Sequence, residues 1–211
     1  MVEPNIVFIS SGLKNGGAEL ALERLLKAHI KKKAFRFVVF SLDSLGPVGE
    51  RMREMGIKVI ALNLRKRSLL LSLPRFFSQI NKLHPTQIHG WMYHGNLFAF
   101  LAWIFQPKAQ LVFNIRQALH SLNSEKLTTR ITILFNALLS RVCALVIHNS
   151  KLGIRHHEKV GFCPRNSLYV PNGFDLAKLS PSQAKRDSFR SMHDIPRQAR
   201  VITLLARYDP I

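Results

Sequence analysis

The apolar residues of this sequence fall into short, β-branched runs that alternate with longer segments of near-helical spacing. Continuous or alternating apolar runs predict strands, whereas a repeat of about three to four residues predicts helices. The predicted strands are residues 5–10, 35–42, 57–62, 86–89, 110–115, 144–148, 167–170 and 201–206. The predicted helices are residues 18–30, 46–55, 69–83, 96–105, 122–143 and 150–160, with one more within 180–200.

Alternation of strands and helices with short connections is typical of parallel strands joined by right-handed helical crossovers. We therefore expect an α/β fold, a doubly wound, Rossmann-like parallel sheet with helices on both of its faces. Residues 1–175 are expected to form this domain. Residues 176–211 are expected to be a linker followed by the first strand of a second domain, because a single strand is not stable by itself.

The composition excludes several classes of protein. Hydrophobic residues make up 47% of the 211 residues, which excludes intrinsic disorder. The longest unbroken apolar run, residues 97–105, is much shorter than the roughly 20 residues of a membrane-spanning helix. Two cysteines fit a reducing compartment, and residues 1–5 do not resemble a secretory signal. We therefore expect a cytoplasmic location, with a peripheral position on the inner face of the membrane as an open alternative.

The chain is strongly basic, with 31 Lys and Arg against 12 Asp and Glu and a net charge of +19. Such a charge attracts nucleic acid, an anionic membrane or phosphorylated small molecules, and it also favours solubility. Residues 64–77 mix basic and apolar side chains, so they could lie on an anionic bilayer. The favoured interpretation is an ordinary helix with its apolar face in the core. We expect no nucleic-acid partner, because no nucleic-acid motif is present.

Ligands of open parallel sheets bind at the carboxyl ends of the strands. Residues 10–17 follow the first predicted strand, residues 89–94 the fourth, Arg116 the fifth, and Asn149 and Ser150 the sixth.

Two glycines, Gly16 and Gly17, connect the first strand to the first helix, where glycine lets backbone N–H groups approach a phosphate. A tight turn is the alternative interpretation. The segment matches neither Gly-x-Gly-x-x-Gly nor Gly-Lys-Ser/Thr, which argues against a dinucleotide cofactor and a P-loop.

Histidines are the other candidates for chemistry. His94 is expected in a loop after the fourth strand, beside Gly95. A structural role for His94 is equally compatible with the sequence. His156 and His157 are adjacent on a predicted helix and are expected to be solvated. His89 and His94 have no third ligand nearby, so we predict no metal site.

Five short motifs or single residues follow one another along the chain: Gly16-Gly-Ala-Glu19, His94, Asn149-Ser150, Val-Pro-Asn-Gly-Phe-Asp at 170–175 and Leu-Ala-Arg-Tyr-Asp-Pro at 205–210. In this the chain resembles the amino-terminal half of the family 4 glycosyltransferases. These are retaining enzymes of the GT-B fold, in which two Rossmann-like domains face each other. The likeness runs from about residue 5 to residue 210.

The resemblance implies roles for individual residues. His94 would be the active-site histidine beside the transferred sugar, and the small Gly95 next to it would leave room for the sugar ring. Asn172 and Gly173 would form the hinge between the domains. Arg207 would bind the nucleotide diphosphate. The residues that would bind donor or substrate are Gly16, Gly17, Glu19, Arg116, Asn149, Ser150 and Arg207. No metal or cofactor is implied, because the nucleotide sugar is itself the substrate.

The family's later lysine and its Glu-x7-Glu motif would lie beyond Ile211, so we expect a truncated enzyme that transfers no sugar by itself. The leading hypothesis is a retaining, sugar-nucleotide-dependent glycosyltransferase that acts on a saccharide or lipid-linked acceptor of the cell envelope. This hypothesis also allows an anionic membrane as a partner, through a peripheral contact. The alternative is a non-catalytic remnant or binding module for an anionic partner.

Overall fold

The computed structural model describes residues 5–30, 32, 34–64 and 69–204. The chain divides into two compact units, Met1–Gly173 and Phe174–Ile211. The assignment of residues 176–211 to the beginning of a further domain stays a prediction.

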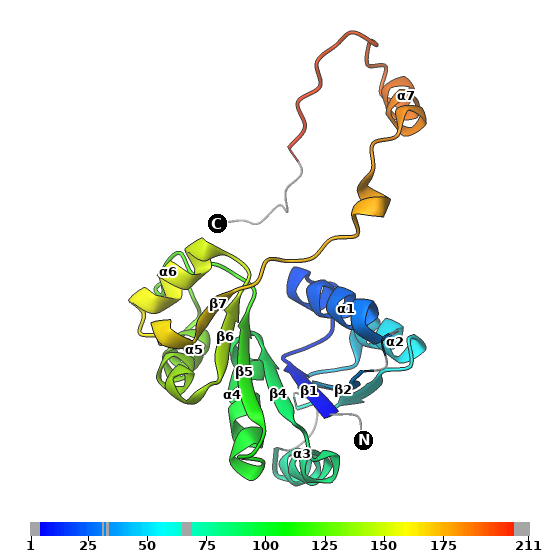
Figure 1. Ribbon diagram of the computed structural model, residues 1–211. Helices are drawn as coiled ribbons and strands as arrows, with labels where there is room; N and C mark the ends of the chain where they lie inside the picture. Colours follow the sequence, from blue (N-terminus) through cyan, green and yellow to red (C-terminus); the bar gives the residue numbers. More distant parts are fainter. Residues whose placement is uncertain (1–4, 31, 33, 65–68, 205–211) are drawn as a thin grey trace. The chain divides into compact units, whose positions relative to one another are not determined.

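The described part of the first unit is built on a sheet of seven strands, and every neighbouring pair is parallel (Figure 1). The strand order is β3-β2-β1-β4-β5-β6-β7. The strands are β1 (Asn5–Ser10), β2 (Arg36–Ser41), β3 (Lys58–Ala61), β4 (Gln87–Trp91), β5 (Gln110–Ile115), β6 (Leu145–His148) and β7 (Ser167–Tyr169). The prediction of a doubly wound parallel sheet is therefore confirmed.

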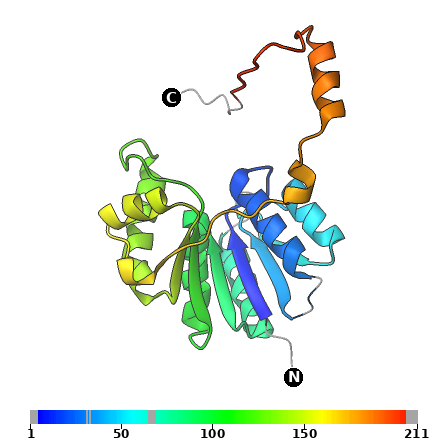
Figure 2. The same ribbon diagram turned by 45° about the horizontal axis from the view of Figure 1, so that its top comes forward.

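Helices cover both faces of this sheet, as Figures 1 and 2 show. The helices of the first unit are α1 (Gly17–Ile30), α2 (Gly46–Glu54), α3 (Leu69–Leu83), α4 (Met92–Phe105), α5 (Leu127–Leu139) and α6 (Lys151–Lys159). One core cluster joins α1 and α2 to the sheet through Leu22, Leu26, Val48, Met52, Phe8 and Val39. The other joins α3, α4 and α5 to the opposite face through Phe76, Ile80, Ala99, Ala102, Ile133, Ala137, Val7 and Phe113. The sequence alternation thus produces two buried layers.

Four predicted elements differ from the structure by more than one residue. Strand β4 ends at Trp91 rather than at residue 89, so His89 lies within the strand and not at its end. Helix α4 begins at Met92 rather than at residue 96, because Met92 adopts a left-handed backbone conformation (φ 64°) that turns the chain from strand to helix at once. Helix α5 begins at Leu127 rather than at residue 122 and ends in a 3-10 turn, Ser140–Val142. Residues 201–204 form no strand, which is reasonable because no strand is described in their unit to pair with them. Residues 205 and 206 lie outside the described part.

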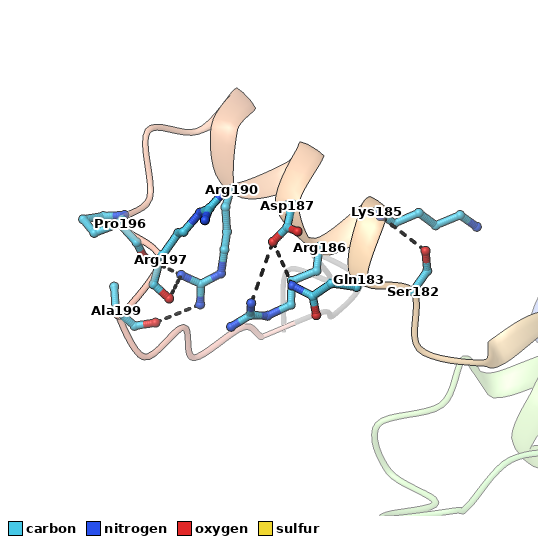
Figure 3. Close-up of polar contacts among 9 residues, drawn as sticks. All are labelled: Ser182, Gln183, Lys185, Arg186, Asp187, Arg190, Pro196, Arg197 and Ala199. Atoms are coloured by element: carbon cyan, nitrogen blue, oxygen red, sulfur yellow. Dashed lines mark hydrogen bonds and ion pairs between the residues drawn. The ribbon is translucent and has the colours of Figure 1, made fainter.

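The second unit contains a 3-10 turn, Leu176–Leu179, and one α-helix, α7 (Gln183–Met192). Ser182 caps α7, since its hydroxyl accepts a hydrogen bond from the backbone N–H of Lys185 at 3.3 Å. Arg190 is almost fully buried and donates to the carbonyls of Pro196, Arg197 (3.2 Å) and Ala199 (2.8 Å) (Figure 3). These bonds fold the following loop back onto the helix.

Among the described helices, none combines the length and the apolar character needed to cross a bilayer.

Candidate functional site

The strand order places a topological switch point between β1 and β4. These strands are neighbours, but the chain continues from β1 toward β2 and from β4 toward β5, in opposite directions along the sheet. Such a reversal opens a crevice at the carboxyl ends of the strands, where ligands of this fold class bind. Most of the predicted site residues follow β1, β4, β5 or β6 directly and therefore lie at this edge; they are Gly16, Gly17, Glu19, His94, Arg116, Asn149 and Ser150.

The two glycines at the end of the connection from β1 to α1, Gly16 and Gly17, have different surroundings. A Cβ on Gly16 would lie 2.2 Å from Oε2 of Glu19, so the Glu19 carboxylate reaches back over the start of the helix. A Cβ on Gly17 would meet nothing within 4 Å, and the backbone there is not left-handed. Packing therefore does not require glycine at position 17. The open space above it lies at the positive end of α1, which favours an anion, and the Glu19 carboxylate already faces this end.

The end of β4 is fixed to the beginning of α1. Trp91 is fully buried, and its indole Nε1 donates a hydrogen bond to the carbonyl of Ala18 at 2.8 Å. Met92 follows with its left-handed backbone, a conformation that costs a non-glycine residue about 1–3 kcal/mol and that clusters at functional sites. This turn starts α4 immediately after the strand.

His94 lies on the first turn of α4, so the expectation that it lies in a loop was wrong. The residue is exposed, so its imidazole is accessible to a ligand. The expectation for Gly95 was also wrong. A Cβ at position 95 would lie 2.2 Å from the carbonyl oxygen of Ile9, so glycine is needed for the close approach of α4 to β1. It leaves no space for a sugar.

Arg116 is a partly buried cation at the carboxyl-terminal edge of the sheet. Its guanidinium stacks over the Trp91 ring at 4.4 Å, and it donates long hydrogen bonds of 3.4 Å to the side-chain oxygens of Asn114 and Asn172. Its Nε is buried without a partner, and within the described part of the chain no carboxylate forms an ion pair with it. Burial lowers the pKa of Arg116 to about 10, so it remains charged at neutral pH. A held cation without a carboxylate suits an anionic ligand.

Asn149 and Ser150 have structural partners. The Asn149 amide donates to the carbonyl of Arg116 at 3.1 Å, which joins the ends of β6 and β5. The Ser150 hydroxyl accepts from the N–H of Gly153 at 2.9 Å and caps α6. A role of either residue in substrate binding stays a prediction.

Behind His94 lies a buried hydrogen-bond network that sequence reasoning missed. His157 is fully buried, contrary to the expected solvation. Its Nδ1 lies 2.7 Å from the carbonyl of Gly153 and must donate to it, so Nε2 of the neutral ring accepts from the Tyr93 hydroxyl at 2.8 Å. Gln117 donates to the same hydroxyl at 3.4 Å. Burial raises the pKa of Tyr93 to about 12 and lowers that of His157.

No sequence signal pointed to this network, because the inward face of α6 depends on where the helix is capped. Its consequence is positional. Tyr93 precedes His94, so its bond to α6 fixes the first turn of α4.

His89 lies within β4 and contacts the ring of Phe8. Its Nε2 is 3.0 Å from Oε1 of Gln87. Burial and, to a smaller extent, the charge of Arg116 lower the pKa of His89 to about 4, so the ring is neutral. Across the described residues, no three His, Cys, Asp or Glu side chains are grouped as a metal site would need. Arg207 lies outside the described part of the chain.

Comparison with known proteins gives a consistent result. The profile of Glycosyltransferase Family 4 matches residues 15–178. No curated protein matches the sequence. Anabaena Alr3699/HepE in complex with UDP and glucose has a similar structure, with a TM-score of 0.72 and 22% sequence identity over 90% of this chain and 50% of that chain.

Two further solved structures are similar. A glycosyltransferase from Rickettsia africae has a TM-score of 0.65 and 10% identity over 94% of this chain and 51% of its own. The lipopolysaccharide outer core galactosyltransferase WaaB, in its apo form, has a TM-score of 0.57 and 14% identity over 81% of this chain and 46% of its own. The chain thus spans about half the length of these proteins. At sequence identities of 10% to 22%, the structural similarity shows the fold alone.

Proposed function

The chain belongs to glycosyltransferase family 4, and from this membership we propose that it is the amino-terminal, acceptor-side half of a retaining GT-B enzyme. That enzyme would transfer a sugar from a nucleotide sugar to a saccharide or lipid-linked acceptor of the cell envelope. The donor class is supported by Alr3699/HepE, whose structures contain UDP with glucose or UDP-glucose. The acceptor class is supported by WaaB, an outer core galactosyltransferase.

The observation that carries this proposal is the half-buried charge of Arg116 at the switch point. Its partners are two amide oxygens and an aromatic ring, so the guanidinium retains donors for a phosphate or a developing negative charge. The open space above Gly17 lets a diphosphate approach the start of α1. His94, exposed on α4, would contact the transferred sugar, and Arg207 would bind the diphosphate, as the family resemblance implies.

A binding module for an anionic partner, without turnover, is the second candidate function, and the same Arg116 supports it. Under both functions we expect a cytoplasmic location, and a peripheral contact with the anionic inner face of the membrane is compatible with each. They differ in chemistry, since only the first consumes a nucleotide sugar. Because a GT-B cleft is closed by two domains, we expect no transfer by the 211-residue chain alone.

Calorimetric titration of the purified chain with UDP-glucose and with UDP tests the site. Replacement of Arg116 by Gln should weaken binding about tenfold or more, because a charge-assisted hydrogen bond is lost. Arg155→Gln is the matched control, since Arg155 is exposed on α6 and the charge change is identical. Equal binding of UDP-glucose by the two variants would contradict the assignment of Arg116.

Release of UDP from UDP-glucose, followed over time with the same chain, tests the expected inactivity. Sustained release above the uncatalysed rate would show that one half is sufficient and would exclude the binding-module alternative.

A further inference from the structure

The outward face of α5 is a continuous apolar stripe. It consists of six side chains that are 47% to 68% exposed: Leu127, Ile131, Leu134, Phe135, Leu138 and Val142. Their spacing places them on one side of the helix and its 3-10 extension, over about 24 Å of axis. The opposite side of α5 is buried and includes Ile133 and Ala137 of the core. We call the six outward side chains the α5 stripe.

Basic residues accompany the α5 stripe. Lys126 and Arg141 are exposed at its two ends, and Arg130 lies partly exposed within α5. No Asp or Glu occurs from residue 126 to residue 157, and the acid that precedes this segment, Glu125, is only partly exposed. An apolar helix face flanked by cations is the pattern of helices that lie in the headgroup region of an anionic bilayer.

Charge complementarity favours a bilayer over a second copy of the chain. Two α5 stripes packed together would bring Lys126, Arg130 and Arg141 of one copy close to the same cations of the other, with no carboxylate on the stripe to compensate them. Anionic lipid headgroups supply the missing negative charge, while the acyl chains receive the leucines and Phe135.

The other basic and apolar segment, residues 64–77, is less suited to this contact. Phe76 of α3 is fully buried and stacks edge-on against Phe40 in the core, and Ile80 of the next turn is buried as well. The favoured interpretation of that segment, a helix with its apolar face inward, is therefore supported for its described side chains. Residues 65–68 lie outside the described part.

We propose that the α5 stripe is the surface by which this protein binds an anionic lipid bilayer. The inference rests on the proposed membrane contact and names the surface that makes it. It is independent of sugar transfer.

Co-sedimentation of the purified 211-residue chain with lipid vesicles tests the inference. The vesicles are phosphatidylcholine alone or phosphatidylcholine with an equal part of phosphatidylglycerol. We expect the original chain to bind the anionic vesicles. The variant Leu134→Gln/Leu138→Gln should bind them about tenfold more weakly, or not at all, because apolar area is lost from the interface. Both positions are half exposed or nearly so, and thermal unfolding checks that the variant folds.

Matched variants separate the explanations. Leu176→Gln/Leu179→Gln removes two leucines of the other unit that are at least as exposed, and this variant should bind as the original chain does. If the first variant does not fold, Leu127→Gln/Ile131→Gln tests the other end of the stripe. Arg130→Gln/Arg141→Gln should weaken binding to anionic vesicles only.

Each contrary result has a distinct meaning. If the original chain binds anionic vesicles and the stripe variants bind equally well, another surface makes the contact and the inference is wrong. If the original chain binds no vesicles, the proposed membrane contact fails as well, while the UDP-glucose titration still judges the sugar site. If sedimentation velocity shows a dimer that the stripe variants dissociate, and no vesicle is bound, the stripe joins two copies and the inference is overturned.

Discussion

The same substitution at two glycines of the site should have opposite consequences. In Gly95→Ala the new Cβ would lie 2.2 Å from the carbonyl oxygen of Ile9, more than 1 Å inside van der Waals contact. The neighbour is strand backbone, so α4 must move away from β1. Overpacking of this kind costs about 1–3 kcal/mol. For a domain of this size each kcal/mol lowers Tm by about 2–4 °C, which gives a decrease of roughly 2–12 °C.

In Gly17→Ala the new Cβ meets nothing within 4 Å, and the backbone is not left-handed. Alanine also reduces the conformational entropy of the unfolded chain. We therefore expect the free energy of unfolding to be unchanged or raised by about 0.4–1 kcal/mol, and Tm to be unchanged or raised accordingly. Binding of UDP-glucose should nevertheless weaken, because the methyl group enters the space through which the phosphate approaches α1.

Thermal unfolding and calorimetry of both variants test the contrast. A Gly17→Ala protein that unfolds as early as Gly95→Ala would refute the packing argument. Unchanged binding of UDP-glucose by a stable Gly17→Ala protein would refute the role of the space above Gly17 in ligand approach.

Three other perturbations have defined outcomes. His148 is buried with neither ring nitrogen bonded, and burial, together with the nearby His157, lowers its pKa from 6.5 to about 4. Because the unfolded chain binds the proton more tightly, roughly 3 kcal/mol of stability should be lost as pH falls from 6.5 toward 4. Denaturant titrations over this range should show a weaker pH dependence for His148→Leu, and an unchanged slope would contradict the assignment. Tyr93→Phe leaves the buried Nε2 of His157 without a donor, so unfolding in denaturant should show a loss of about 1–3 kcal/mol; no loss would mean that the hydroxyl contributes nothing to the fold. His94→Ala should change stability by less than about 0.5 kcal/mol, because the side chain is exposed. In a polypeptide that joins this chain to a donor-binding half, it should lower turnover about 10²–10⁴-fold, and an unchanged rate per folded molecule would exclude a catalytic role.

Local patterns in the sequence are sufficient to predict the layered fold and the edge of the sheet that carries the candidate residues. Local apolar runs such as residues 5–10 and 110–115 coincide with β1 and β5, because a strand buried on both faces must be apolar throughout. Strict strand–helix alternation then leaves few topologies, and each of them brings the ends of the strands together. The order of the elements along the chain is therefore sufficient to assign Gly16, His94 and Arg116 to one edge of the sheet.

Only long-range packing shows which of these residues are fixed by neighbouring groups and which remain accessible to a ligand. The stacking of Arg116 on Trp91, the bond between Tyr93 and His157 and the approach of Gly95 to Ile9 all join residues far apart in the chain. The same holds for α5, whose apolar residues lie on more than one face; only its packing against α4 shows which face is buried. Propensity and periodicity act over one or two turns of chain, whereas burial depends on what the rest of the chain places opposite.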